Sequence, residues 1–462
     1  MNIIKFLQGC IFFSIILSIF DGLNIKAGIL QQGFIYPTVL GIFFFFLWKY
    51  EKKESLYLNI IHKKYALLIM YIAINSFINI NNIIGLEYKG LTSESRLVGN
   101  ILVLVILFLL TIYYYNVLLI KKNILYWIYK ATVYGMFATS IYGLIQLAGI
   151  FQSDIANNIY HFVEPYVNIQ MKPYEMNYPP RRLVGFSKEG STFGNYMSVI
   201  FPWIVMGLIC FNKKIMSFIM IFLSIIFVIF SYSRIAYGCI FLELLVMLLW
   251  VNKFKKICIN LKFLGALSVI LLSVIVFMVS SGIVDFDTLF LKITDVVFSF
   301  SDDASDNRVA SNVTRIGLQY AAFSIFIDNF LLGIGLGQFQ FHAVPYLPNW
   351  SYLSLEIQGF ANPGDTNFFY GTFNTHVRIL AELGIIGFIL WINIIYQGFK
   401  NYIYIIKNVD QDRKDIIKLI IISYIASIIS FINFDIFEFF YFWLLLILSG
   451  VIVYKIKNNK NI

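Results

Sequence analysis

Arginine is the residue type whose placement in this chain points to chemistry. Arg182, Arg234 and Arg315 each lie where a polar stretch meets an apolar one. A guanidinium group is a planar fork of five donors that stays protonated and binds phosphate or carboxylate through two parallel hydrogen bonds. The pattern predicts an anionic, phosphorylated ligand. The alternative is that these arginines pair with nearby Asp and Glu residues and serve the fold.

Four stretches bring such residues together with possible bases. The first contains Arg182 and Glu189, with Ser191 or Thr192 as the expected helix cap. The second is a short turn around Arg234, and the third runs from Arg315 through an apolar segment to glycines. The fourth is the entrance to an apolar segment. In order, they are 181–203 (RRLVGFSKEGSTFGNYMSVIFPW), 231–240 (SYSRIAYGCI), 311–339 (SNVTRIGLQYAAFSIFIDNFLLGIGLGQF) and 373–391 (FNTHVRILAELGIIGFILW).

The fourth stretch offers His376 as a general base, and Glu189 of the first stretch is the second candidate. Arg378 can contribute to an anion site. Because Arg378 and Glu382 are four residues apart on one helical face, the alternative for Arg378 is a mutual ion pair.

The sequence predicts neither a metal site nor a cofactor. The acidic run 301–306 (SDDASD) lacks the glycine and the distal glutamate of a calcium loop. The glycines at 333, 335 and 337 follow no predicted strand, which argues against a dinucleotide site. The four cysteines form no CxxC or Cys/His pattern and are expected to be buried thiols.

The elements that must position these residues are apolar helices. The chain of 462 residues is 59% hydrophobic and 13% charged, with a mean hydropathy of +0.78, whereas soluble domains carry about 25% charged residues. Spans need about 20 apolar residues each. We therefore predict an all-α, polytopic integral membrane protein with about twelve transmembrane helices, at 6–20, 29–48, 65–84, 97–120, 124–150, 192–211, 215–231, 234–251, 261–283, 377–399, 416–433 and 436–454.

The lysines give this arrangement an orientation. Lysine-rich connections fall on alternate loops, so one side of the membrane receives nearly all of them. By the positive-inside rule that side is cytoplasmic, and both termini lie there. The net charge of +10 is then a topology signal, which excludes nucleic acid as a partner. The chain is expected to be a single membrane domain, 1–462, with long outer loops at 151–191 and 284–376.

The basic residues divide between the two sides by type. Seven of the eight arginines fall on the predicted outer side or at outer span ends, and only Arg413 falls inside. Most of the 27 lysines are on the inner side or within spans. After Arg315, apolar residues recur at helical spacing up to Phe330, so this helix in the second outer loop is expected to lie in the outer leaflet.

The four stretches together resemble the bacterial O-antigen ligase/polymerase superfamily, which includes the Wzy-type O-antigen polymerases. Its recurring features are Arg-x-x-Gly before a span, Ser-Arg-x-Ala at an outer turn, an Arg-led helix ending in Asn-Pro-Leu-x-Gly-x-Gly, and a His-Asn-rich span entry ending in Glu-x-Gly-x-x-Gly. The corresponding segments here are 182–185, 233–236, 315–335 and 374–387. Phe330 replaces the usual proline, and Phe373 with Asn374 occupies the place of a ligase-type His-Asn pair.

The resemblance implies a metal-independent glycosyltransferase of the bacterial inner membrane. Its substrate would be an undecaprenyl-pyrophosphate-linked oligosaccharide in the outer leaflet, and its product a surface polysaccharide such as lipopolysaccharide O-antigen or capsule. Arg315 and Arg182 would stabilise the departing pyrophosphate, with Arg234 and Arg378 binding it. A chain-length regulator and a flippase are the implied protein partners. The displaced histidine favours a polymerase.

Other functions stay open at this point. An O-antigen ligase would transfer the glycan to lipid A core or another acceptor. A lipid-linked oligosaccharide flippase or transporter would carry its ionisable residues in a central cavity, often between internal repeats. The modest mid-span candidates for such a cavity are Glu243 and Lys130. A metal-dependent glycosyltransferase would use outer carboxylates such as Asp302, Asp303 and Asp306.

Overall fold

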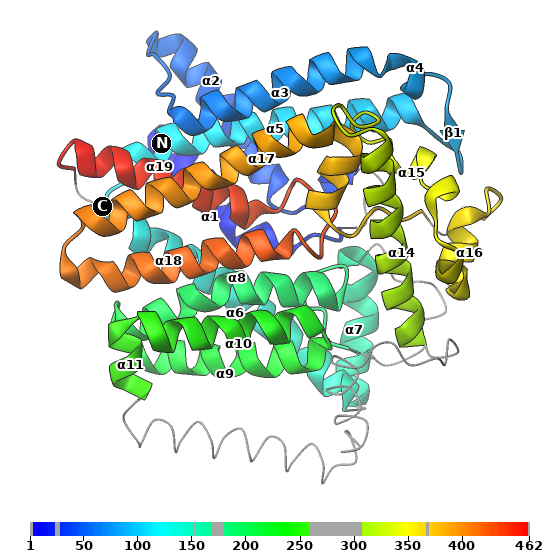
Figure 1. Cartoon of the computed structure of the whole chain (residues 1–462). Helices are drawn as coiled ribbons and strands as arrows, with labels where there is room; N and C mark the ends of the chain where they lie inside the picture. Colours follow the sequence, from blue (N-terminus) through cyan, green and yellow to red (C-terminus); the bar gives the residue numbers. More distant parts are fainter. Residues whose placement is uncertain are drawn as a thin grey trace.

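The computed structural model describes residues 3–23, 28–151, 153–168, 180, 182–258, 307–365 and 369–460. These residues fold almost entirely into helices (Figure 1), and the all-α prediction is confirmed. The strands in the described part are β1 (Glu87–Tyr88) and β2 (Leu91–Thr92), which form a short antiparallel hairpin.

From α1 to α10 the long helices run back and forth in chain order, and so do α17 to α19, whereas α17 runs in the same direction as α10. The long helices are α1 (Ile3–Ile16), α2 (Ile35–Lys52), α3 (Ile60–Ile78), α5 (Ser93–Ile120), α6 (Ile124–Ile150), α8 (Gly190–Ile209), α9 (Lys214–Ser231), α10 (Arg234–Trp250), α17 (Thr375–Asn408), α18 (Gln411–Ser430) and α19 (Phe440–Lys457).

The other helical elements lie in the connections, and all of them except the 22-residue α14 are short. They are η1 (Leu17–Ile19), η2 (Gly28–Gln31), α4 (Ile80–Ile83), α7 (Asp154–Val167), α11 (Asn252–Cys258), α14 (Asn307–Asp328), α15 (Phe339–His342), η4 (Val344–Tyr346), η5 (Asn349–Leu353) and α16 (Leu355–Ala361).

Each predicted span that falls on described residues is a helix, with ends shifted by up to nine residues. The span predicted at 261–283 lies outside the described residues. By length and composition, six of the described helices can cross a membrane: α5, α6, α8, α9, α17 and α19. The other long helices are shorter or less apolar, which is why a count of about twelve exceeds six. The protein is an all-helical membrane protein.

The centre of the bundle is packed by α8, α18 and α19. Nearly all residues of α8 and α19 are buried, and Trp203, Trp391 and Trp443 are among the largest side chains with no exposure. The Trp203 indole donates a hydrogen bond to the Ser423 hydroxyl (3.1 Å), so α8 and α18 are joined by a polar contact as well as by packing.

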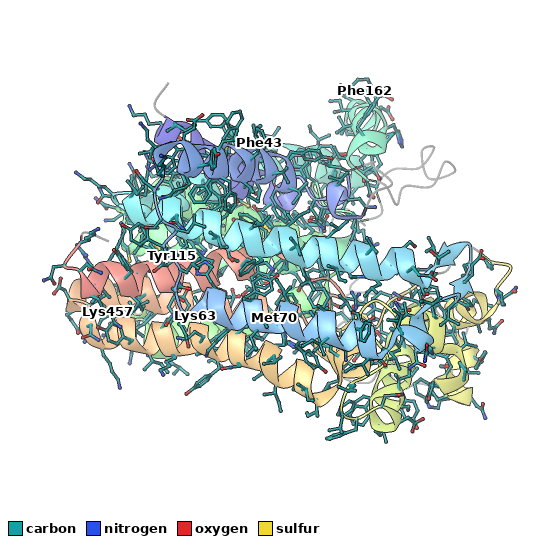
Figure 2. The ribbon with its side chains drawn as sticks, turned by 90° about the horizontal axis from the view of Figure 1, so that it is seen from above. Phe43, Lys63, Met70, Tyr115, Phe162 and Lys457 are labelled. Atoms are coloured by element: carbon teal, nitrogen blue, oxygen red, sulfur yellow. The ribbon has the colours of Figure 1, made fainter. Side chains whose placement is uncertain are left out.

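The outer helices instead expose apolar side chains. Phe43 of α2 is 59% exposed and Met70 of α3 is 60% exposed, and Figure 2 shows both on the surface of the bundle. Apolar side chains on the outside of a helical bundle of this length are what a lipid environment requires.

The two ends of the bundle differ. We call the end that carries α7, α14 and α16 the loop end, and the opposite end, where both termini lie, the terminal end (Figure 1). The first long connection contains α7, and the described part of the second contains α14 to α16. Lys63 and Lys457 lie at the terminal end (Figure 2), whereas Arg182, Arg234 and Arg315 lie at the loop end.

Candidate active site

A cavity of about 470 Å³ lies at the loop end, and three arginines line it. Arg182 precedes α8, Arg234 begins α10, and Arg315 belongs to α14. The remaining lining residues come from the α9–α10 turn, from α14, from the segment before α17 and from the turn between α18 and α19. They are Ser191, Tyr232, Ser233, Ile235, Ser311, Asn312, Ile316, Gln319, Phe373, Ile432 and Asn433.

Arg182 is positioned by a tight segment that ends at a glycine. The amide oxygen of Gln146 accepts hydrogen bonds from the backbone N–H groups of Val184 (3.1 Å) and Gly185 (2.8 Å). Gly185 has a φ of +57°, and a Cβ there would lie 2.5 Å from the Phe193 ring. A side chain is therefore excluded by both backbone and space, which explains the Arg-x-x-Gly spacing.

Arg234 is the first residue of α10, directly after a sharp turn. Tyr232 ends α9 in the left-handed region with a φ of +52°. The Ser233 hydroxyl then caps α10 by accepting the N–H of Ala236 (3.4 Å). The turn directs Arg234 into the cavity rather than into the bundle.

Two glycines of α8 bring the helices around this turn into close contact. A Cβ on Gly194 would lie 2.6 Å from the Ala236 Cβ and 2.7 Å from the Ser233 Cβ. One turn earlier, a Cβ on Gly190 would lie 2.5 Å from the Ser231 carbonyl oxygen. Small residues four apart allow this approach, as in other membrane helix pairs. The same residues therefore set the distance between the Arg182 segment and Arg234.

Arg315 is held from two sides. Its Nη1 donates a hydrogen bond to the Asn433 side-chain oxygen (2.8 Å), and its guanidinium lies 5.1 Å from the centre of the Phe373 ring. Phe373 has a φ of +53°, an unfavourable conformation for a residue with a side chain. Strain of this kind persists where surrounding contacts require it, and it recurs at functional sites.

The glycine-rich corner after α14 fixes that helix against α17. Gly333 and Gly384 have φ values of +67° and +63°, and Cβ atoms on either would lie within 2.6 Å of the other segment's backbone. Backbone hydrogen bonds join Ile334 N–H to the Ala381 carbonyl (3.1 Å) and Ile385 N–H to the Phe330 carbonyl (2.9 Å). The stretches 311–339 and 373–391 are thus in direct contact at these glycines, and α17 is kinked at Gly384.

The cavity carries a positive field. Burial is the largest influence on Arg315 and lowers its pKa, and the neighbouring Arg182 and Arg234 lower it as well. Glu189 and Glu356 act in the opposite direction. Because a guanidinium stays protonated near neutral pH in spite of such shifts, three positive charges meet two carboxylates in this region. The excess suits an anionic ligand.

An apolar face of α14 leads away from the cavity. Ile316 lines the cavity and is 46% exposed, and Tyr320, Phe323, Ile327 and Phe330 continue along the helix with exposures of 49–60%. Side chains three to four residues apart share one helical face. This face matches the predicted one, and its position in a lipid leaflet stays a prediction.

A family model described as O-antigen ligase matches residues 219–392. The match covers less than half of the chain and is consistent with the resemblance to the O-antigen ligase/polymerase superfamily. It reaches from α9 to α17 and includes Arg234 and Arg315, whereas Arg182 precedes it. Members of the superfamily are glycosyltransferase-like enzymes. No curated protein shows a significant match to the chain.

The two candidate bases are Glu189 and His376, and of these Glu189 lies beside the cavity. The lining residue Ser191 donates a hydrogen bond to Glu189 Oε2 (2.9 Å). Glu189 is also the N-cap residue of α8, and its N–H is bonded to the Thr192 hydroxyl (3.2 Å). The expectation that Ser191 or Thr192 caps this helix is therefore wrong, since the helix begins at Gly190.

His376 does not line the arginine cavity. Its Nδ1 accepts a hydrogen bond from the Trp391 indole (3.2 Å), and its ring contacts Phe431 edge-on. These partners belong to the packed centre of the bundle. The position of His376 therefore favours a role in helix packing over the proposed role as first-choice base.

Arg378 is also removed from the cavity lining, and protein groups occupy its donors. It bonds Glu382 (3.0 Å), both the carboxylate (3.2 Å) and the carbonyl (3.1 Å) of Asp435, and the Asn100 side chain (2.8 Å). It is 7% exposed. The ion-pair alternative describes this residue, and pyrophosphate binding by Arg378 stays a prediction that these contacts do not support.

Sequence reasoning missed the partners of Arg315. Asn433 lies in the α18–α19 connection, which was predicted to be a tight hairpin, and Phe373 lies just before α17. The available signal was the sequence 433–438 (NFDIFE), which places three polar residues in a turn between apolar helices. Glu356 of α16, whose charge acts on Arg315, carried no signal of its own.

Among the residues that the structure describes, no three or more His, Cys, Asp or Glu side chains are grouped as metal ligands. The acidic run 301–306 lies outside the described residues. The described cavity offers the guanidinium groups of its arginines and, beside them, the carboxylate of Glu189.

Proposed function

We propose that this protein is a polysaccharide polymerase that joins undecaprenyl-pyrophosphate-linked oligosaccharide repeat units. The observation that carries the proposal is the convergence of Arg182, Arg234 and Arg315, from three separate segments, on one cavity beside an exposed apolar helix face. A pyrophosphate attached to a polyprenyl chain needs both features. The family match supports a glycan-transferring activity.

The arrangement suggests how the donor binds. The guanidinium groups take the pyrophosphate, and the polyprenyl chain follows the apolar face of α14 that begins at Ile316. The volume of about 470 Å³ lies within the ~300–1,000 Å³ typical of small-molecule sites. The growing glycan then extends from the loop end, where polar connections replace the apolar helices.

The reaction that follows is a glycosyl transfer. A hydroxyl of the acceptor sugar attacks the anomeric carbon of the donor. A carbon–oxygen bond forms there as the bond from that carbon to the pyrophosphate oxygen breaks, and the pyrophosphate leaves with the electron pair. The arginines stabilise the charge that develops on the departing oxygen, a form of catalysis that typically contributes 10²–10³-fold per donor.

The acceptor hydroxyl must also lose its proton. Glu189 is the base that the geometry favours, because a lining residue already bonds its carboxylate. In this proposal Arg182 and Arg315 hold the leaving group, Arg234 assists in binding, and Glu189 takes the proton. General-base catalysis contributes roughly 10²–10⁴-fold.

We propose that the loop end faces the outside of the bacterial inner membrane and that both termini are cytoplasmic. The support is the lysine content of the terminal end, because basic residues flanking spans remain on the cytoplasmic side. The donor would then meet the cavity in the outer leaflet. A flippase that delivers it and a regulator of chain length are the proposed partners.

An O-antigen ligase is the second candidate, and the match to an O-antigen ligase family supports it. The placement of His376 outside the cavity lining favours the polymerase, since a histidine at the span entry is the ligase-type feature. The two enzymes use the same donor and differ in the acceptor.

The test is deletion of the gene followed by analysis of the surface glycan. A polymerase deletion leaves single repeat units attached at the surface. A ligase deletion leaves long polymer on the lipid carrier, and a flippase deletion traps single units inside the cell. Complementation with wild type and with Arg315→Ala links the phenotype to the cavity. Long polymer on the carrier would overturn the polymerase proposal in favour of the ligase.

A further inference from the structure

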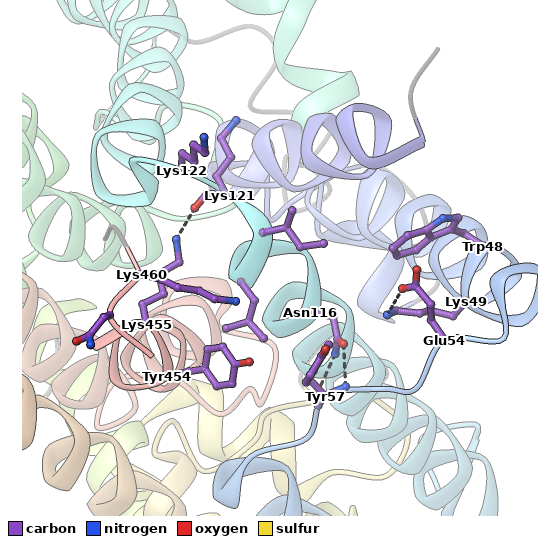
Figure 3. Close-up of a pocket in the computed structure, with 13 residues that line it drawn as sticks. Trp48, Lys49, Glu54, Tyr57, Asn116, Lys121, Lys122, Tyr454, Lys455 and Lys460 are labelled. Atoms are coloured by element: carbon purple, nitrogen blue, oxygen red, sulfur yellow. Dashed lines mark hydrogen bonds and ion pairs between the residues drawn. The ribbon is translucent and has the colours of Figure 1, made fainter. Parts of the chain in front are cut away.

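A second and larger cavity, of about 610 Å³, lies at the terminal end of the bundle (Figure 3). Three chain segments enclose it: the end of α2 with the residues that follow, the turn between α5 and α6, and the end of α19 with the residues that follow. Neither the superfamily match nor the proposed reaction assigns a role to this cavity, because the match begins at residue 219 and ends at residue 392.

The cavity collects positive charge. Among the described residues that line it are the lysines Lys49, Lys121, Lys122, Lys455 and Lys460, with Glu54 as the carboxylate. Glu54 pairs with Lys49 at 3.0 Å and is itself half exposed. Five ammonium groups and one carboxylate leave a large positive excess around one space.

Membrane topology alone does not require lysines in this position. Lys63 and Lys457 lie at the same end, are exposed to solvent, and satisfy the positive-inside pattern without forming a cavity. Lys49 and Lys455 are instead only 7% and 2% exposed. Burying an ammonium group costs free energy unless hydrogen bonds or opposite charge compensate it. Glu54 and the Ser55 carbonyl bond Lys49, and the Lys121 carbonyl accepts a hydrogen bond from Lys455. An anion in the cavity would balance the positive charge that remains around it.

The walls of the cavity hold the lysines in place. Tyr57 and Asn116 exchange hydrogen bonds between the Tyr57 backbone and the Asn116 side chain (2.9 and 3.0 Å), which fixes the segment after α2 against α5. Lys455 donates to the Lys121 carbonyl, so α19 is tied to the α5–α6 turn. Figure 3 shows both contacts as dashed lines. The site is therefore built by the fold and not by loose surface side chains.

The other lining residues indicate what kind of anion fits. Trp48, Tyr57 and Tyr454 are aromatic side chains of the type that gathers where protein meets lipid headgroups. Leu119 and Ile120 add an apolar flank, and Ile120 is 51% exposed. Lysine binds phosphate as a point charge, and basic pockets between membrane helices hold phosphate-bearing headgroups.

We propose that this lysine cavity binds the phosphate group of an anionic ligand. An anionic phospholipid headgroup is the source that the aromatic and apolar flank favours, and a soluble polyphosphate is the other source with the same chemistry. The proposal is independent of the glycosyltransferase reaction, since its residues lie at the opposite end of the bundle from the arginine cavity (Figure 1).

The experiment uses the full-length protein in nanodiscs and in detergent. Thermal unfolding is followed with phosphatidylcholine alone, with added phosphatidylglycerol or cardiolipin, and separately with inorganic pyrophosphate. The test variant is Lys122→Gln/Lys460→Gln, which removes two exposed lining lysines and spares the buried pair. The matched control is Lys63→Gln/Lys457→Gln, which removes the same charge from the same end but outside the cavity.

Wild type and the control variant are expected to be stabilised by the ligand to the same extent. Binding to the test variant is expected to weaken by about 30-fold, from roughly fivefold per lysine at an anionic membrane surface. Protection by anionic lipid alone assigns the headgroup, and protection by pyrophosphate assigns the soluble source. Equal loss in the test and control variants would mean a nonspecific charge effect and would overturn the proposal, as would the absence of protection by every probe.

Discussion

Replacing Arg315 by lysine keeps the positive charge and removes the planar guanidinium. In the structure that guanidinium bonds Asn433 at 2.8 Å and lies 5.1 Å from the Phe373 ring, and Arg315 lines the cavity. An ammonium group at the end of a lysine stem cannot reproduce this geometry. Loss of one charge-assisted hydrogen bond costs about 1.5–3 kcal/mol, and loss of a cation–π contact costs about 0.5–1 kcal/mol.

Together these losses amount to about 2–4 kcal/mol, which corresponds to a decrease of about 30- to 1,000-fold in kcat/KM. Arg315→Lys should therefore be nearly as inactive as Arg315→Ala. The assay is the length distribution of polymer formed by purified protein in vesicles loaded with a lipid-linked repeat unit. Melting temperatures of the variants establish that the fold is retained.

Arg413→Lys is the matched control, because Arg413 begins α18 at the terminal end and is exposed to solvent. It should be fully active. If Arg315→Lys polymerises within threefold of wild type, a point charge is sufficient at this position. The reasoning that assigns bidentate phosphate binding to Arg315 would then be wrong.

Other variants test the elements around the cavity. Phe373→Leu removes the ring beside the Arg315 guanidinium and should lower kcat/KM by about 2- to 5-fold, from a contact of about 0.5–1 kcal/mol; an unchanged kcat/KM would show that the ring does not hold the arginine. Gly194→Val places a side chain where a Cβ already meets Ala236 at 2.6 Å, so the yield of folded protein in detergent should collapse, and a normal yield would contradict the close α8–α10 contact. Glu189→Gln keeps the hydrogen bond from Ser191 and loses basicity, so turnover should fall by about 10²–10⁴-fold at an unchanged melting temperature. His376→Gln should retain turnover within about threefold of wild type in the same assay, because the His376 ring lies outside the cavity lining. The reverse order of these two activities would restore the histidine as the base.

The helices could be predicted from the sequence because hydropathy and length are local properties. Apolar runs locate α5, α6, α8, α9, α18 and α19 within a few residues, whereas α17 extends nine residues past its predicted end and α7 was not predicted. The arginines could be singled out for a similar reason, since their clustering next to span ends is visible along the chain. Even the exposed face of α14 follows from the spacing of its apolar residues.

The composition of the cavity could not be predicted in the same way. Whether Arg182, Arg234 and Arg315 meet depends on how α8, α10 and α14 pack, and residues far apart in sequence decide that packing. Gly190 and Gly194 allow α8 to approach the α9–α10 turn so closely that a Cβ atom at either position would overlap it. No local pattern distinguishes such glycines from those that merely tolerate a turn.

The same limit applies to Arg378. Its neighbour Glu382 was visible one helical turn away, but Asp435 and Asn100 reach it from α18–α19 and from α5. Only the tertiary structure shows these partners. An arginine at a span end is thus a candidate for ligand binding until its partners are known. Arg315 and Arg378 each have an amide and a ring beside them, but two carboxylates pair with Arg378.

The two cavities give the unequal distribution of Arg and Lys a physical meaning. At the loop end the cavity is lined by guanidinium groups, and at the terminal end by ammonium groups. A fork of donors in fixed directions can follow the oxygens of a leaving pyrophosphate as charge develops on them, whereas mobile point charges can only neutralise an anion that stays in place. On this argument Arg315→Lys should lower turnover strongly, and a Lys-to-Arg exchange at Lys122 or Lys460 should leave anion binding at the terminal end intact. A loss of binding in those Lys-to-Arg variants, measured by the same thermal shift, would show that the lysine cavity also depends on the shape of its cationic groups. The two cavities would then not differ in this respect.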